Sequence, residues 1–124
     1  MRSLGAVLLV VLMGCSGAAA PRVPVFGRVT MRGYPLRSGA IAFTPDRQRG
    51  GEGPTSRADL TYDGRFILPA GGLTPGWYRI TVASLDVALP VRLRDPETAG
   101  ITREVVAGRE NSLLIELETS LANR

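Results

Sequence analysis

Apolar and polar residues alternate in short runs along most of this chain, from position 25 almost to its end. The alternation repeats every second residue, which is the period of a β-strand with one buried face. Glycine, proline and aspartate separate the runs, and no apolar stripe of useful length has helical spacing. About seven antiparallel strands in one all-β domain, a β-sandwich or a small barrel, are therefore expected. The pattern predicts strands at 25–31, 40–44, 57–62, 65–68, 77–84, 101–106 and 112–118.

The same alternation predicts which side chains face the core. The inward positions are Ile41, Phe43, Phe66, Leu68, Tyr78, Ile80, Val82, Leu113, Ile115 and Leu117. Phe26 and Trp77 fall on the opposite parity of their strands and are expected on outer faces. An outward indole marks an interface or a sugar-stacking surface, unless another segment covers it. The loop at 47–54 and the stretch near Leu89 are the two candidates for such a cover.

Three segments between or beside the core strands carry further expectations. The dipeptide Asp63-Gly64 is typical of a two-residue type I′ turn, so the strands on either side of it are expected to form a hairpin. The segment 47–54 combines glycine with charge and predicts a mobile loop that buries almost nothing. The segment 101–106 has an ambiguous period, which is typical of an edge strand whose free backbone groups could pair with a strand of a partner.

The N-terminal segment has a different character from the rest of the chain. Arg2 precedes an apolar run from Leu4 to Met13, and a small residue precedes Cys15. A positive charge, a short apolar run and a small residue form the layout of a secretory signal, and the run is shorter than the roughly 20 residues of a membrane span. The segment therefore predicts an exported protein.

The end of that run, Leu12-Met13-Gly14-Cys15, resembles the lipobox of bacterial lipoproteins, in which the cysteine is diacylated. The resemblance implies a signal peptide at 1–14 and a lipidated Cys15 with a tether at 15–24. It places the protein in the cell envelope, anchored to a membrane, at the outer membrane or on the periplasmic face. The alternative is an ordinary signal peptide cut after Ala20, which would leave a soluble domain.

The strings Gly27-Arg28-Val29-Thr30, Asp63-Gly64-Arg65-Phe66 and Pro75-Gly76-Trp77-Tyr78 resemble the carboxypeptidase-regulatory-like, transthyretin-like domain. The likeness covers nearly the whole mature chain, with the sandwich at 25–119 and a C-terminal tail at 120–124. The chain resembles the small bacterial lipoproteins that carry this domain alone. Its motifs are turn and core residues, so the resemblance implies a fold and a non-catalytic accessory or surface module, and it names no ligand.

The composition limits the catalytic and metal-binding chemistry that is expected of this chain. The chain has no histidine, which removes the commonest general base and the commonest metal ligand. The spacing Asp59-x-Thr61-x-Asp63-Gly64 is similar to the start of a calcium loop, but Ala70 stands where the bidentate glutamate is needed. We therefore expect no enzyme activity, no cofactor and no metal site.

The charge balance is basic but evenly spread. Fifteen basic residues, all arginine, stand against eleven acidic ones, for a net charge of +4. Guanidinium groups suit phosphate and carboxylate anions. Because the arginines are scattered singly along the chain, we expect a solvated surface rather than a basic patch. We also expect no nucleic-acid partner, because the protein is predicted to be exported.

These observations predict a non-catalytic cell-envelope lipoprotein whose β-sandwich binds or scaffolds another envelope component, either a protein or a polysaccharide. The alternative prediction is a carbohydrate-binding module on the cell surface that uses the exposed aromatic residue Trp77 together with Phe26 or Tyr62.

Overall fold

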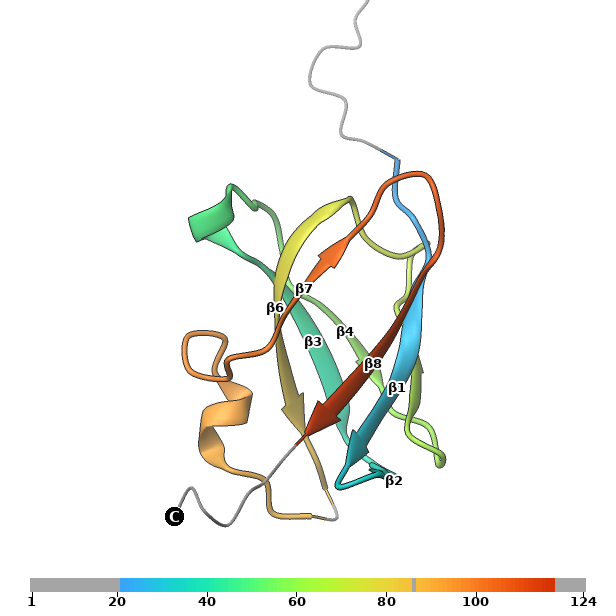
Figure 1. The fold of residues 1–124 in the computed structure, drawn as a ribbon, viewed down its shortest axis with the longest axis vertical. Helices are drawn as coiled ribbons and strands as arrows, with labels where there is room; N and C mark the ends of the chain where they lie inside the picture. The colour runs from blue at the N-terminus through green and yellow to red at the C-terminus, as the bar shows by residue number, and fades with distance from the viewer. Residues whose placement is uncertain (1–20, 86, 118–124) are drawn as a thin grey trace, which may run out of the picture.

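The computed structural model describes residues 21–85 and 87–117. The predicted signal peptide (1–14), Cys15 and the C-terminal tail (120–124) lie outside these ranges. Within them the chain forms eight strands and two short 3-10 helices (Figure 1). The elements are β1 (Val25–Met31), β2 (Tyr34–Pro35), β3 (Ala40–Pro45), η1 (Arg47–Arg49), β4 (Ser56–Asp59), β5 (Arg65–Ile67), β6 (Gly76–Ala83), η2 (Val91–Arg94), β7 (Thr102–Val105) and β8 (Asn111–Leu117).

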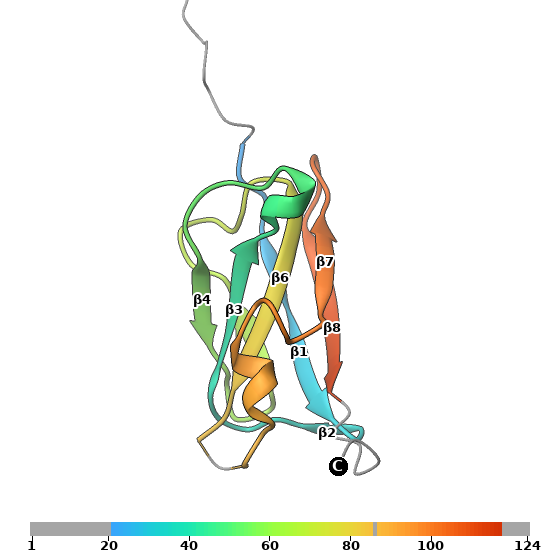
Figure 2. The same cartoon turned by 90° about the vertical axis from the view of Figure 1, so that its left-hand side faces the viewer.

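The strands form two sheets. β1 is the centre of the first sheet, and β8 pairs with it in parallel along its whole length. β5 and β2 pair antiparallel with successive parts of the other edge of β1. The second sheet is antiparallel throughout, in the order β4-β3-β6-β7, which Figure 2 shows from one side to the other. This arrangement confirms the all-β prediction.

The number and direction of the strands differ from the prediction. The described residues contain eight strands, and the β1–β8 pair is parallel although all strands were expected to be antiparallel. Alternation indicates which face of a strand is buried, but it contains nothing about the neighbouring strand or its direction. A parallel pair needs a long connection, and here all the other strands lie between β1 and β8 in the chain.

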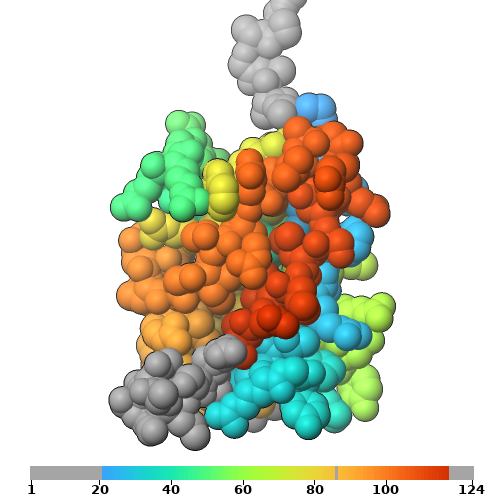
Figure 3. Space-filling view, viewed as in Figure 1, coloured from blue at the N-terminus to red at the C-terminus, as the bar shows by residue number. Residues whose placement is uncertain are grey.

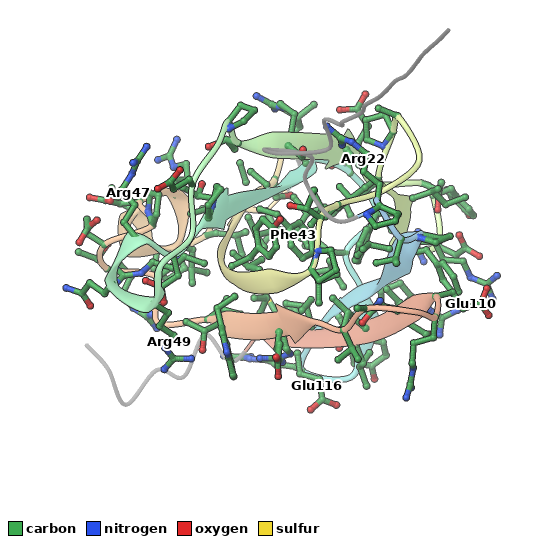
Figure 4. The ribbon with its side chains drawn as sticks, turned by 90° about the horizontal axis from the view of Figure 1, so that it is seen from above. Arg22, Phe43, Arg47, Arg49, Glu110 and Glu116 are labelled. Atoms are coloured by element: carbon green, nitrogen blue, oxygen red, sulfur yellow. The ribbon has the colours of Figure 1, made fainter. Side chains whose placement is uncertain are left out.

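The core lies between the two sheets. Phe43 is its central side chain, with ring centroids 5.9 Å from Phe66 and 6.2 Å from Tyr78. Figure 4 shows Phe43 in the middle of the molecule when it is viewed along its length. Burying each large apolar side chain stabilises the fold by roughly 1.5–3 kcal/mol. The inward positions predicted from the sequence are buried, apart from Leu113, which is partly buried against the core.

The core begins earlier in the chain than the sequence indicated. Val23, which was placed in the tether, is buried and forms an isolated bridge with Leu73. Nearby, the guanidinium of Arg22 donates a hydrogen bond to the carbonyl oxygen of Gly72 at 2.9 Å. The chain is therefore attached to the sandwich before β1 starts.

The type I′ hairpin turn occurs at a different place from the predicted one. Arg32 and Gly33 both have positive φ, 54° and 86°, and join β1 to β2 as a two-residue turn. At Asp63-Gly64 only the glycine has positive φ, at 79°. The strands on either side of that dipeptide, β4 and β5, belong to different sheets. The hairpin prediction at Asp63-Gly64 is therefore wrong, because a local turn signal does not say which strands pair beyond the turn.

The segment 47–54 begins with an ordered structure rather than a free loop. Its first residues form η1, and Asp46 caps this helix by accepting a hydrogen bond from the backbone N–H of Gln48 at 3.1 Å. The backbone N–H of Gly51 also donates to the carbonyl oxygen of Asp46 at 2.9 Å. The prediction that this segment buries almost nothing is confirmed, because none of its residues is buried.

One side of the sandwich has two strand edges close together. β7 is the last strand of its sheet, as the sequence predicted, and β8 is the outer neighbour of β1. The guanidinium of Arg103 donates to the carbonyl oxygens of Thr102 in β7, at 2.8 Å, and Leu114 in β8, at 3.3 Å. A cation on a sheet edge discourages unwanted strand pairing, so Arg103 both links the two sheets and protects the edge of β8.

Asn111 holds the connection between β7 and β8. Its amide accepts from the backbone N–H of Val106 at 2.9 Å and donates to the carbonyl oxygens of Val106 and Arg109 at 3.1 and 3.0 Å. The residue is buried. All the polar atoms of this side chain are thus engaged in fixing the turn that starts β8.

We expect Asn111→Asp to lower the free energy of unfolding by about 1–3 kcal/mol, because the two donated hydrogen bonds are lost and a carboxylate faces two carbonyl oxygens. Urea denaturation measures this change. The neighbouring exposed substitution Glu110→Gln is the matched control and should change stability by less than about 0.5 kcal/mol. Equal stability of the two variants would contradict the role assigned to Asn111.

Candidate binding surface

The three aromatic residues singled out in the sequence do not form one site. Trp77 lies on β6 with its side chain on the outer face of the second sheet, opposite in parity to the buried Tyr78. Phe26 lies on β1 with its side chain on the outer face of the first sheet. Tyr62 lies in the turn between β4 and β5, where it is exposed and under the guanidinium of Arg37, 5.4 Å from its ring centroid. A binding site that combines Trp77 with Phe26 would have to span both faces of the sandwich.

Trp77 is covered by the segment 47–54, one of the two covers that the sequence suggested. The guanidinium carbon of Arg49 lies 4.2 Å from the centroid of the indole, in cation–π geometry. Figure 4 shows Arg47 and Arg49 at the same end of the molecule. Leu89, the other candidate, packs against the core instead. One face of the indole is thus occupied by the protein's own side chain.

A buried carboxylate explains why Arg49 lies there. Asp46 is 2 % exposed, and its oxygens lie 3.2 Å from Nε of Arg79 and 3.7 Å from Nε of Arg49. Arg79 also donates to the side chains of Gln48 at 2.8 Å and Glu97 at 3.3 Å. These groups satisfy one another, and the cluster joins η1, β6 and the loop after η2. The contacts within this cluster stabilise the fold, and they do not indicate a ligand.

We expect Arg79→Gln to destabilise the fold by about 3–5 kcal/mol, because the buried carboxylate of Asp46 then keeps only its longer contact with the more exposed Arg49. Arg57→Gln is a control with the same change in charge, on an exposed position of β4 in the same sheet. Thermal and urea denaturation should separate the two variants clearly. If they unfold alike, the Asp46 cluster does not carry the stability assigned to it.

A groove crosses the outer face of the first sheet, over β5, β1 and β8. It has a volume of about 390 Å³ and is partly open to solvent. Because Val25 and Val29 point into the core, Phe26 and Arg28 between them point outward and into this groove. The lining residues are Phe26, Gly27, Arg28, Arg65, Ser112, Leu113 and Leu114.

The strand registers place the side chains of this surface in two rows. Arg28 is the direct cross-strand partner of Arg65 on one side and of Leu114 on the other. In the adjacent row Phe26 lies between Ile67 and Ser112. Two arginine residues are therefore directly opposed across neighbouring strands, next to a row that contains an aromatic residue. We call this set, Phe26, Arg28, Arg65, Ile67, Ser112 and Leu114, the arginine groove.

The arginine groove exposes apolar as well as charged groups. Ile67 is 76 % exposed and Leu114 is 50 % exposed. At its floor, Gly27 allows β1 and β8 to approach each other, because a Cβ at this position would collide with the carbonyl oxygen of Leu113. Exposed aliphatic side chains beside cations are typical of an interaction surface.

A carboxylate stands beside Arg65, and a second one, Glu116, follows Leu114 by two residues on the outer face of β8. Asp63 lies 3.5 Å from Nε of Arg65 and accepts a hydrogen bond from the hydroxyl of Thr61 at 2.8 Å. This hydrogen bond, followed by smaller effects that include the charges of Arg65 and Arg28, holds the pKa of Asp63 below its ordinary value. Asp63 is thus ionised at neutral pH and compensates part of the positive charge.

Sequence reasoning missed the arginine pair. Phe26 is the one predicted contact residue that lies in the arginine groove. The arginines are scattered singly along the chain, but the strand register makes Arg28 and Arg65 direct neighbours on this face. The sequence contained one signal for the pair: strand alternation places both arginines at outward positions, next to the buried Val29 and Phe66. Parity alone does not pair the strands, so the juxtaposition becomes visible only in the folded sheet.

The remaining features and the comparisons with known proteins place no further limit on function. Within residues 21–85 and 87–117, no three histidine, cysteine, aspartate or glutamate side chains gather as metal ligands. The same ranges include no helix with the length and hydropathy to cross a membrane. No protein-family model, no curated protein and no solved structure matches this chain. Its function has to be argued from its own residues, and the arginine groove is the surface that carries the argument.

Proposed function

We propose that this protein is a non-catalytic lipoprotein of the cell envelope whose β-sandwich binds another envelope component through the arginine groove. The single observation that carries the binding role is the placement of two arginines, an aromatic ring and exposed aliphatic side chains together on one open face. Support for the anchor comes from the charge, apolar run and cysteine at the start of the sequence. The absence of histidine from the sequence favours a role without catalysis.

The finer description of the fold is part of the same proposal. The turn and core residues that resemble a transthyretin-like domain favour that type of sandwich, and two four-stranded sheets are compatible with it. A lipid on Cys15 would hold the sandwich close to a membrane, because the chain from Cys15 to Pro21 reaches at most about 20 Å. The arginine groove runs over the side of the sandwich rather than its end, so it would stay accessible in an anchored molecule.

Of the three aromatic residues in the carbohydrate-binding alternative, one lies in the arginine groove. Phe26 lies in the arginine groove, whereas Trp77 has Arg49 on one face of its ring and Tyr62 is engaged by Arg37. A sugar ring would therefore find its aromatic contact at Phe26, beside cations, rather than at Trp77.

The anchor is tested by Cys15→Ser in the native host. We expect this variant to move from the membrane fraction to the soluble fraction, because the thiol that carries the lipid is missing. Ser16→Ala, one residue away, is the matched control and should stay with the membrane. Mass spectrometry of the mature N-terminus completes the measurement. Membrane association of Cys15→Ser, or an unmodified terminus near Pro21 in the native protein, would contradict the lipid anchor.

The binding role is tested by a photoreactive amino acid placed in the living cell at position 114, in the arginine groove. We expect it to capture a reproducible envelope component, either a protein or a polysaccharide. The same probe at position 57, on the outer face of the other sheet, is the control and should capture little. Equal capture at both positions, or none at position 114, would contradict the assignment of the binding surface.

A further inference from the structure

The arrangement of Arg28 and Arg65 is unfavourable for the isolated protein. The two residues are direct cross-strand partners on the same face of the sheet, and like charges at directly opposed positions destabilise a sheet. The core under them is formed by other side chains, such as Val29 and Phe66, so packing does not require arginine at either position. A ligand that brings negative charge would remove this repulsion.

The carboxylate beside the pair compensates it only in part. Asp63 is within ion-pair distance of Arg65 but accepts its shortest hydrogen bond from Thr61. Within the described ranges, no carboxylate lies within ion-pair distance of Arg28. The arginine groove therefore has an excess of positive charge at its centre, with guanidinium donors available for a second anion.

The other side chains of the arginine groove add an apolar contact to this charge. The ring of Phe26 adjoins the hydroxyl-bearing Ser112 in one row, and Leu114 adjoins Arg28 in the next. An aromatic ring offers a face for the C–H side of a sugar, and guanidinium groups bind carboxylates in bidentate geometry. The groove is partly open to solvent, so a bound sugar does not have to be enclosed by the protein.

From this combination, and resting on the proposed binding function, we infer that the arginine groove binds an acidic polysaccharide, with its carboxylates on Arg28 and Arg65 and a sugar ring on Phe26. The backbone groups of β1 inside this face are engaged by β5 and β8, so recognition depends on side chains and not on strand addition by a peptide. Figure 3 shows β8 and β1 side by side at the surface, so a polymer could reach this part of the molecule without a change in fold.

The inference is tested with the full-length protein in neutral detergent, by calorimetric titration with polygalacturonate, a polymer of uronic acid. Methyl-esterified polygalacturonate is the matched ligand control because it keeps the sugar backbone and removes the charge. We expect the free acid to bind at least about tenfold more tightly than the ester, since the charge-assisted hydrogen bonds to guanidinium are lost in the ester. This comparison does not depend on any variant folding correctly.

Variants then locate the site. Arg28→Gln and Arg65→Gln should each weaken binding by about tenfold or more, and Phe26→Leu should also weaken it. Asp63→Asn should tighten binding, because it removes a competing carboxylate. Arg57→Gln on the other sheet is the control with the same change in net charge and should bind as the wild type does. Thermal denaturation of each variant confirms that it is folded.

Equal binding of the acid and the ester would overturn the inference, as would an equal loss of binding in Arg57→Gln and Arg28→Gln. Tighter binding to polyglutamate or to anionic lipid vesicles than to polygalacturonate would overturn it as well. If polygalacturonate does not bind while the probe at position 114 still captures an envelope protein, the polysaccharide assignment fails and the proposed binding function stands.

Discussion

The parallel pairing of β1 with β8 fixes the positions of both the core and the arginine groove. Its register places Val29 beside Ile115 on the core side. The same register places Arg28 beside Leu114 on the outer side. A shift of one residue would move every side chain of β8 to the other face. The core and the arginine groove are therefore two sides of a single pairing, and neither can change without the other.

The Asp46 cluster organises the second sheet in a comparable way. A buried carboxylate requires charged partners, and Arg79 and Arg49 supply them from β6 and η1. The position of Arg49 then brings its guanidinium over Trp77. The residue that looked most available for binding in the sequence is thus engaged by the fold, whereas Phe26, on the other sheet, remains in an open groove.

Much of the fold could be predicted from the sequence, but less of the candidate site. Alternation correctly assigned Ile41, Phe43 and Ile80 to the core, because burial of one face leaves a signal in every strand. The turn at Asp63-Gly64 was assigned to a hairpin that does not exist, because its flanking strands pair in different sheets. The sequence also does not indicate that Arg28 and Arg65 are neighbours, because pairing between distant strands leaves no local pattern.

The local pattern of the chain indicates the residues of most strands, the apolar faces of those strands and the signal-like character of the N-terminal segment. These properties depend on the chemistry of residues that are neighbours in the sequence. The folded chain adds that β8 lies parallel to β1, that Arg49 covers one face of Trp77, and that Arg28 and Arg65 are direct cross-strand partners. Those outcomes depend on strand pairing between segments far apart in the chain, where many registers and partners satisfy the same local pattern.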